Sequence, residues 1–344
     1  MDTEKDRVRQ VDRSDILVTV AMPAYNAVRW IPKAIDSVLA QTLADWELII
    51  VNDGSTDGTE ALVRQYDDPR IRLVNQENGG PSHARNVAMA LACGKYISLL
   101  DADDWYAPRH LERTTGFLDA HPECVLVATN FRFVNAEGEE TVGYQPNEIL
   151  GRAGDGIVTD FFNAATRNRC FPVTCGMAFK RDLLTSLGGF DESLDGAEDQ
   201  EFQARWAMKG SYGYIDDVLG YYRDYTPGSV RKDLGKTIRM RVRAWQKLTS
   251  AEPTSLPCWS SYAKFRSFYL FRLIALAIAT GYLDEAEEAA ATWPRSPGHL
   301  HWWMGKTLAS APKCCKQLVH VFLKRFAFVK QRQGDHLPGG ASQE

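Results

Sequence analysis

The chain has 344 residues, of which 44% are hydrophobic and 24% are charged, and its formal net charge at pH 7 is −4. A chain of this length can bury a core without covalent crosslinks, and its acidic balance gives no global electrostatic reason to bind nucleic acid. The seven cysteines contain no CxxC pair, which excludes the usual zinc-site spacing and favours a reducing compartment.

Neither a signal peptide nor a membrane span is expected. Residues 1–15 are charged throughout and lack the apolar core of a signal peptide. The longest apolar stretch, residues 270–279, contains Arg272 and is shorter than the ~20 residues that a spanning helix needs. We therefore expect a cytoplasmic protein.

Short apolar runs and helical spacings alternate over the first two thirds of the chain. The predicted strands cover residues 16–23, 47–53, 71–76, 95–101, 124–135, 174–182 and 212–222. The predicted helices cover residues 29–41, 57–66, 82–93, 109–120, 158–165 and part of 187–210, and beyond them 234–250, 259–280, 284–292 and 313–332. Asp57 and Glu60 are expected to form a capping box. The alternation is typical of an α/β fold with a mostly parallel sheet flanked by helices.

In such sheets ligands bind beyond the carboxyl ends of the strands. The segment DADD, residues 101–104, places three carboxylates at one strand end. A hard divalent cation relieves their repulsion, and Mg²⁺ is usually held by one or two carboxylates together with substrate phosphates. The alternative is a turn that caps the next helix, which we would favour for an isolated DxD.

Two further strand ends change that balance. Asp53 shares an edge with DADD in a parallel sheet, and its carboxylate can accept a hydrogen bond from a base N–H such as that of uracil. The GSTDG that follows it is typical of a turn and helix cap. The segment PAYN, residues 23–26, adds an aromatic ring and an amide, and Tyr25 can either stack on a base or pack inside the protein.

The segments PAYN, VNDGSTDGT, NGGPSHARN and LLDADDWY, in this order and spacing, resemble the inverting glycosyltransferase family 2 with its GT-A fold, over about residues 15–230. The resemblance implies a base held by the first two segments, and a ribose and a divalent cation (Mn²⁺ or Mg²⁺) held by the DxD carboxylates. The implied nucleotide-binding residues are Pro23, Ala24, Tyr25, Asn26, Asp53, Gly80, Arg85, Asp101, Ala102 and Asp103. The implied metal ligands are Asp103, Asp101 and Asp104, and the sequence leaves open whether Asp103 or Asp104 is the main one.

Inverting transfer also needs a group that takes the proton of the acceptor hydroxyl. GAEDQEFQARW offers Glu198 and Asp199, and similar family members carry an ED pair. The resemblance implies Asp199 as the base and Glu198 as the neighbour that orients the acceptor. The alternative is an acidic first helical turn favoured by the helix dipole.

Two departures from the family pattern stand out. Phe202 occupies the glutamine position of the QxxRW pattern of processive synthases, which argues against a polymerising synthase. Tyr225 occupies the histidine position of the YRxHxxS stretch, so either the metal site lacks that histidine or this loop binds differently. Arg205 and Trp206 are expected to be structural.

The segment 313–332 has six Lys or Arg residues, no acid, and an apolar stripe. Such a helix can lie on an anionic membrane surface or dock on the protein with its basic face in water, and both options stay open. Family members that build surface glycans use lipid-linked acceptors, so the resemblance implies a glycan or lipid-linked acceptor.

Together these features predict transfer of a sugar, from a nucleotide-sugar donor that we expect to be UDP-linked, to an acceptor hydroxyl. The rival is a catalytically silent nucleotide-binding or scaffold module. Neither the GxGxxG of a dehydrogenase nor a P-loop occurs. The expected divisions are a disordered N-terminus (1–14), a GT-A domain (15–232, with a nucleotide-binding half 15–105 and an acceptor half 106–232), a helical region (233–332) and a disordered tail (333–344).

Overall fold

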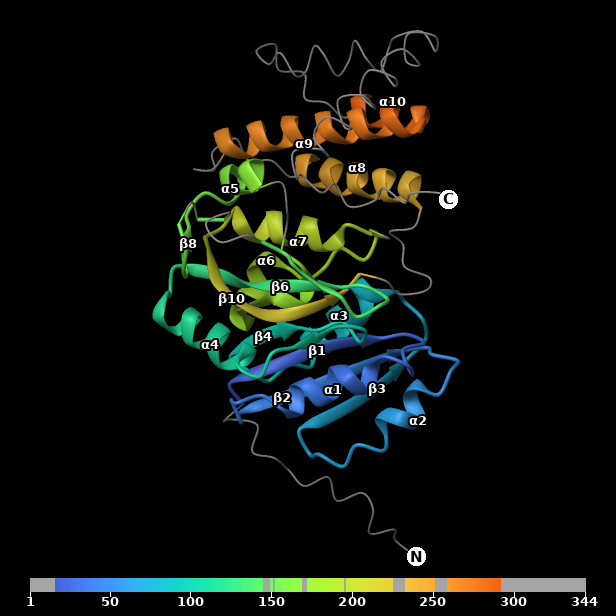
Figure 1. Ribbon diagram of the computed structural model, residues 1–344, viewed down its shortest axis with the longest axis vertical. Helices are drawn as coiled ribbons and strands as arrows, with labels where there is room; N and C mark the ends of the chain where they lie inside the picture. Colours follow the sequence, from blue (N-terminus) through green and yellow to red (C-terminus); the bar gives the residue numbers. More distant parts are fainter. Residues whose placement is uncertain are drawn as a thin grey trace, which may run out of the picture. The chain divides into compact units, whose positions relative to one another are not determined.

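The computed structural model describes residues 16–144, 149–150, 152–168, 172–194, 196–224, 233–250 and 259–291 (Figure 1). The chain forms two compact units, Met1–Ser229 with Pro253–Cys258, and Val230–Glu252 with Trp259–Glu344. The predictions for residues 1–14, 313–332, 333–344 and Tyr225 lie outside the described residues.

The first unit is built on a mixed sheet with the strand order β3-β2-β1-β4-β9-β6-β10-β5, to which β7 adds on β6 and β8 on β10. Its strands are β1 (Val18–Ala24), β2 (Trp46–Asp53), β3 (Ile71–Gln76), β4 (Tyr96–Leu99), β5 (Trp105–Tyr106), β6 (Cys124–Val134), β7 (Glu140–Val142), β8 (Gly156–Val158), β9 (Met177–Lys180) and β10 (Ser211–Arg223). Its helices are α1 (Ile31–Leu39), α2 (Thr59–Val63), α3 (Pro81–Ala90), α4 (His110–Ala120), α5 (Phe161–Asn168), α6 (Leu184–Leu187) and α7 (Glu198–Ala207).

The predicted α/β class is confirmed, and the parallel pairing holds for one half of the sheet. β1 pairs in parallel with β2 and β4, and β2 pairs in parallel with β3. β9 then lies antiparallel between β4 and β6, which makes the sheet mixed. Because β1, β2 and β4 point the same way, their carboxyl ends bring PAYN, Asp53 and DADD to one edge.

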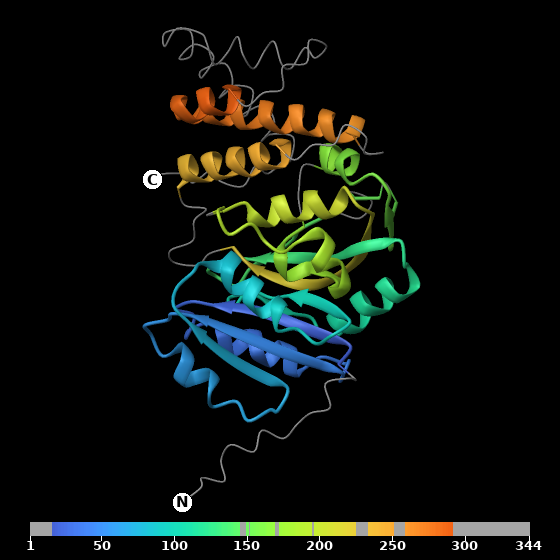
Figure 2. The ribbon, with the colours of Figure 1, turned by 180° about the vertical axis from the view of Figure 1, so that it is seen from behind.

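Burial on both faces explains the apolar runs of the central strands. All eight residues of β2 are buried, and so are six of the seven residues of β1. Figure 1 shows α1 in front of the sheet, and Figure 2, seen from behind, shows α3 on the opposite face. The buried side of α1 carries Ile31, Ala34, Ile35 and Val38, the spacing of an amphipathic helix.

One local prediction is wrong. α2 begins at Thr59 with Gly58 as its N-cap and no side-chain cap, so Asp57 and Glu60 do not form a capping box. Glu60 instead accepts hydrogen bonds from Arg64 and Asn75. Asp57 accepts from the backbone N–H groups of Thr59, at 2.9 Å, and Val28, at 3.1 Å, and thereby ties the loop after β1 to the loop after β2.

The second unit consists, in its described part, of α8 (Leu234–Ser250), α9 (Trp259–Thr280) and α10 (Leu283–Ala291). These helices share an apolar core that includes Ile238, Val242, Leu270 and Ile274. Across the residues that the structure describes, no helix combines the length and apolar character needed to cross a membrane.

Candidate active site

Asp53 organises one corner of the site from the end of β2. Its side chain is buried, and its Oδ1 accepts hydrogen bonds from Gln76 Nε2 at 2.7 Å and from the Gly79 N–H at 2.8 Å. Its Oδ2 accepts one bond, from the Gly80 N–H at 2.9 Å. Gly80 caps α3 with φ of +86°, a conformation that favours glycine. The carboxylate therefore fixes the start of α3, and Oδ2 keeps one lone pair free of these bonds.

The loop after β1 is held against the loop after β2. Asn26 adopts a left-handed conformation with φ of +48°, and its Oδ1 accepts from the Thr56 N–H at 2.8 Å. The Asn26 N–H donates to Ser55 Oγ at 3.0 Å. Tyr25 lies between the buried Ala24 and Asn26 in the sequence, and its side chain is 53% exposed. The ring of Tyr25 is thus exposed to solvent, on a loop held by the buried β1 on one side and by the hydrogen bonds of Asn26 on the other.

A buried arginine joins DADD to the acidic start of α7. Arg85, on α3, donates from Nη2 and Nε to Asp101 Oδ1, at 2.7 and 3.2 Å, and from Nη1 to Glu198 Oε1 at 2.9 Å. Asp101 Oδ2 accepts from Thr174 Oγ1 at 3.0 Å. Burial disfavours the charged form of Arg85, but the two carboxylates outweigh it and raise its pKa above its usual range. The guanidinium is therefore a permanent positive centre between the two predicted acidic motifs.

The three aspartates of DADD lie in different surroundings. Asp104 is 1% exposed, and its Oδ1 accepts from the Arg223 N–H at 2.8 Å. Burial first, and then the charges of Asp103 and Asp101, raise its pKa well above its usual value. Asp101 and Asp103 are both half-buried, and Ala102 between them is buried. Asp104 thus faces the protein interior, whereas the other two keep access to solvent.

The residues present fit a cation that is shared with a substrate. In the described ranges, no three His, Cys, Asp or Glu side chains cluster closely enough to hold a metal by themselves. Mg²⁺ and Mn²⁺ need only one or two carboxylates when phosphate oxygens complete their shell. Asp101 and Asp103, half-buried and two residues apart, offer such a pair.

The start of α7 is shaped by an unusual backbone. Its N-cap, Ala197, has φ of +58°, which costs an L-residue strain and re-aims the chain into the helix. Glu198 and Asp199 follow directly and are half-buried, and Asp199 Oδ1 accepts from the Gln200 N–H at 2.8 Å. The strained turn therefore presents both acids at the first turn of the helix, beside Arg85.

The carboxyl-terminal part of α7 packs against the protein and does not face the site. Arg205 donates to the Gly189 carbonyl at 2.6 Å and pairs with Glu201. Trp206 Nε1 donates to the Gly188 carbonyl at 3.2 Å. Phe202, at the position where the synthase pattern has glutamine, stacks on Phe190 with ring centroids 4.5 Å apart.

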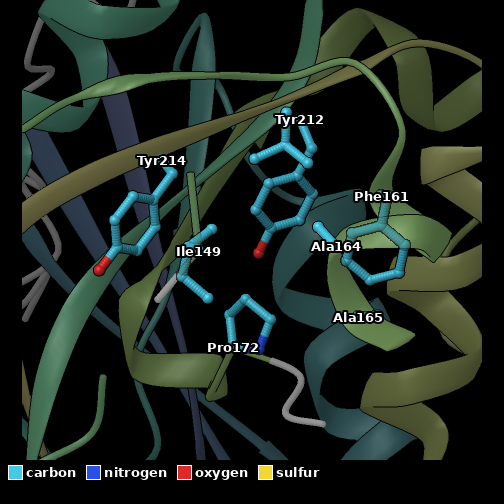
Figure 3. A pocket seen from close by; sticks show the side chains of 8 residues that line it. Ile149, Phe161, Ala164, Ala165, Pro172, Tyr212 and Tyr214 are labelled. Atoms are coloured by element: carbon cyan, nitrogen blue, oxygen red, sulfur yellow. The ribbon is translucent and has the colours of Figure 1, made fainter. Parts of the chain in front are cut away.

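An apolar pocket lies apart from these charged groups, in the later half of the sheet. It is lined by Ile149, Val158, Phe161, Ala164, Ala165, Pro172, Tyr212 and Tyr214. Figure 3 shows the ring of Tyr212 between Ile149 and Phe161. This lining contains no cation or carboxylate, so it does not suit a diphosphate or its metal.

Some site residues were not predicted. Gln76 and Gly79, which bind Asp53, lie in the segment NQENGG after the third predicted strand, whose polar composition could have indicated them. Thr174, which binds Asp101, has no local sequence signal. Arg223, whose N–H binds Asp104, ends β10, which pairs with β5 directly after DADD. The two residues are 119 positions apart, and this pairing could not be read from the sequence.

Comparison with known proteins bears on the family and the fold of the chain. Residues 19–188 match the model of Glycosyl transferase family 2, and through them the chain belongs to that family of enzymes. It is 40% identical over 206 residues to a chondroitin synthase of Pasteurella multocida, covering 59% of this chain and 20% of the relative. It is 43% identical over 214 residues to the uncharacterised glycosyltransferase EpsJ of Bacillus subtilis, covering 60% and 61%. The chain thus spans between a fifth and about three fifths of these relatives.

Solved structures share the fold. A crystal structure of S. aureus TarS 1-349 in complex with UDP-GlcNAc has a TM-score of 0.66 at 18% identity, covering 93% of each chain. The mannosyltransferase PcManGT from Pyrobaculum calidifontis in complex with GDP-Man and Mn²⁺ has a TM-score of 0.54 at 24% identity, covering 93% of this chain and 88% of that one. These likenesses confirm the predicted GT-A fold.

Proposed function

We propose that the chain transfers a sugar from a UDP-linked donor to an acceptor hydroxyl with inversion at the sugar carbon. The observation that carries this proposal is the buried Arg85, which brings Asp101 and Glu198 together although 97 residues separate them in sequence (198 − 101). The bridge holds the start of the Glu198–Asp199 pair beside the DxD motif, as a direct displacement between donor and acceptor would need. The TarS structures with UDP and with UDP-GlcNAc support the choice of donor.

The base of the donor is assigned to the corner between β1 and β2. Asp53 Oδ2 accepts one hydrogen bond from the residues that the structure describes, so it can accept a second from a base N–H. The exposed ring of Tyr25 supplies a stacking surface. Pro23, Ala24, Asn26 and Gly80 complete the walls. The fixed loops mean that little ordering free energy is lost when the base binds.

The ribose and the diphosphate are assigned to DADD. Asp101 Oδ1 accepts two N–H groups of Arg85. Among the described residues Oδ2 accepts only from Thr174, so one acceptor position remains there for a ribose hydroxyl or a cation. Since Asp104 faces inward, Asp103 is assigned as the main metal ligand, with Asp101 beside it. A bound Mn²⁺ or Mg²⁺ would stabilise the negative charge of the departing diphosphate.

Asp199 is assigned as the base that takes the proton of the acceptor hydroxyl. A carboxylate at the first turn of α7 can take this proton as the hydroxyl oxygen attacks the sugar carbon opposite the leaving diphosphate. Glu198 is held by Arg85 and orients the acceptor.

The acceptor is proposed to be a growing glycan or a lipid-linked sugar, in surface polysaccharide synthesis at the cytoplasmic face of a membrane. The acceptor half is assigned to residues 106–232, and contact with the membrane to residues 313–332, which lie outside the described residues. The chain has no membrane-spanning helix in its described part.

The test is turnover. UDP release from a panel of UDP-sugars is measured with Mn²⁺, with and without oligosaccharide acceptors, for the wild-type protein and Asp199→Asn. Acceptor-stimulated UDP release by the wild type that Asp199→Asn lacks would support the proposal. UDP binding without any turnover of the panel would favour the silent nucleotide-binding module instead.

A further inference from the structure

Beside DADD lies a cluster of cations stacked on indole rings, here called the cation patch, made of Arg29, Trp30, Lys33, Trp105 and Arg223. Lys33 Nζ lies 3.3 Å from the centroid of the Trp105 ring. The guanidinium carbon of Arg223 lies 4.2 Å from the Trp30 ring and 5.2 Å from the Trp105 ring, and that of Arg29 lies 4.3 Å from Trp30. Three cations from two distant parts of the chain thus converge on two rings.

These cations differ from most other arginines of the first unit, which form ion pairs with carboxylates. Arg64, Arg70, Arg85, Arg109, Arg113 and Arg205 each form an ion pair with an acid. Within the part of the chain that the structure describes, none of Arg29, Lys33 and Arg223 has an ion pair. Glu140, whose charge acts on Lys33, is itself paired with Arg132 at 3.4 Å. The charges of Asp103 and Asp104 act on Arg223 without forming an ion pair with it. The patch therefore holds three cations, none of which is ion-paired within the described residues.

Crowding like charges is unfavourable in the free protein. The Trp30 ring is contacted by the guanidinium groups of Arg29 and Arg223. The Trp105 ring is contacted by the guanidinium of Arg223 and the ammonium of Lys33. An anion placed between them relieves this repulsion, and the stacked rings hold the cations in place before it arrives. Arg29 and Lys33 are exposed, so solvent reaches the patch.

The patch adjoins the segment assigned to the donor. Arg223 Nε donates to the Asp103 carbonyl at 3.1 Å, and the Arg223 N–H donates to Asp104. Trp105 follows Asp104 directly and stacks on Tyr221, with ring centroids 5.3 Å apart. An anion on the patch therefore lies next to the end of DADD, where the proposed metal ligand Asp103 is found.

We propose that Arg29, Lys33 and Arg223 form a binding subsite for a phosphate group next to the donor site. Its role in catalysis rests on the proposed function, whereas its existence does not. A phosphate offers three acceptor oxygens and up to two negative charges, which suit three convergent cations. The phosphate can come from the diphosphate of the donor or from a phosphate-bearing acceptor, and the experiment distinguishes the two.

The test is calorimetric titration of inorganic pyrophosphate in metal-free buffer. The variant is Arg29→Gln/Lys33→Gln, which keeps polar side chains and removes two charges. The matched control is Arg64→Gln/Lys209→Gln, which removes two charges from exposed positions outside the patch. We expect pyrophosphate to bind the wild type and the control equally, and the patch variant about tenfold more weakly. An unchanged thermal midpoint of the patch variant confirms that it is folded.

UDP then identifies the source. If the donor supplies the phosphate, the patch variant also binds UDP about tenfold more weakly, and pyrophosphate competes with UDP. If an acceptor supplies it, UDP binding is unchanged and pyrophosphate still binds the UDP-saturated protein. Equal pyrophosphate binding by patch variant and control, or none by the wild type, overturns the subsite. Because UDP binding to the wild type is measured separately, that result leaves the donor assignment standing.

Discussion

Arg85 and Glu198 form a buried ion pair, with Nη1 and Oε1 2.9 Å apart, between side chains 113 residues apart in sequence. The same guanidinium holds Asp101 of DADD from its other edge. The pair thereby fixes the start of α7 relative to the end of β4. In our account the spacing between the start of α7 and the end of β4 decides whether the attacking hydroxyl can reach the donor sugar.

Arg85→Ala is expected to be strongly destabilising. It leaves the carboxylates of Asp101 and Glu198 without their shared partner in a largely buried place, which costs about 3–5 kcal/mol of unfolding free energy. The exposed pair Arg64–Glu60 provides the control, since Arg64→Ala should cost no more than about 1 kcal/mol. Urea unfolding followed by fluorescence measures both. Equal costs for the two variants would contradict a structural role for the Arg85 bridge.

Arg85→Lys tests whether the geometry of the guanidinium matters beyond its positive charge. Lysine keeps the positive charge but cannot bind Asp101 and Glu198 with a planar fork. We expect a folded protein whose kcat falls by about tenfold or more, because the two acidic groups are no longer held in register. Steady-state kinetics with the active UDP-sugar test this, and an unchanged kcat would show that the bridge has no positioning role.

Asp53→Asn should weaken UDP binding. An asparagine keeps the size of the side chain, but its NH₂ group turns a donor toward N–H groups that now donate to Asp53. The loss of a charge-assisted hydrogen bond is expected to reduce UDP affinity by about 2 kcal/mol. Calorimetry measures it, with Asp36→Asn on the exposed side of α1 as the control. Similar affinities for both variants would remove Asp53 from the base site.

Much of this site could be predicted because its residues follow long apolar strands. β1, β2 and β4 are buried runs that show clearly in the sequence, and they carry PAYN, Asp53 and DADD at their ends. The partners of those residues could not be predicted. Thr174 reaches Asp101 from a short 3₁₀ turn, and no periodicity connects the two.

The later sheet was harder to predict for physical reasons. An apolar run shows that a strand is buried but not in which direction it runs, so the antiparallel β9 was not anticipated. β5, β7 and β8 are two or three residues long, too short to show an alternation. The sequence also could not separate the burial of Asp104 from the solvent access of Asp103, because adjacent residues point to different sides of the chain.

His110 should make stability depend on pH. It is fully buried, stacks on Tyr106 with ring centroids 3.8 Å apart, and burial lowers its pKa to about 3 from a usual 6.5. The unfolded chain therefore binds a proton below pH 6.5 that the folded protein does not. The stability that neutral His110 supplies is complete above pH 6.5 and is lost as the pH falls toward 3, by at most about 1.4 kcal/mol per pH unit.

His110→Gln isolates this contribution from other titrating groups. The variant should be less stable than the wild type at pH 8, and the difference should narrow as the pH falls to 4. A difference that stays constant from pH 8 to pH 4 would mean that the buried imidazole does not titrate in this way. Urea unfolding at each pH provides the values.

The measurement that tests the central claim most directly is calorimetric titration of UDP into the protein, with Mn²⁺ and then with EDTA, repeated on Asp103→Ala. Our account predicts that UDP binds more tightly with Mn²⁺ and that this enhancement disappears in Asp103→Ala, while the weaker metal-free binding through Asp53 and Tyr25 remains. Failure of the folded wild-type protein to bind UDP under either condition would contradict the UDP donor site at the edge formed by β1, β2 and β4.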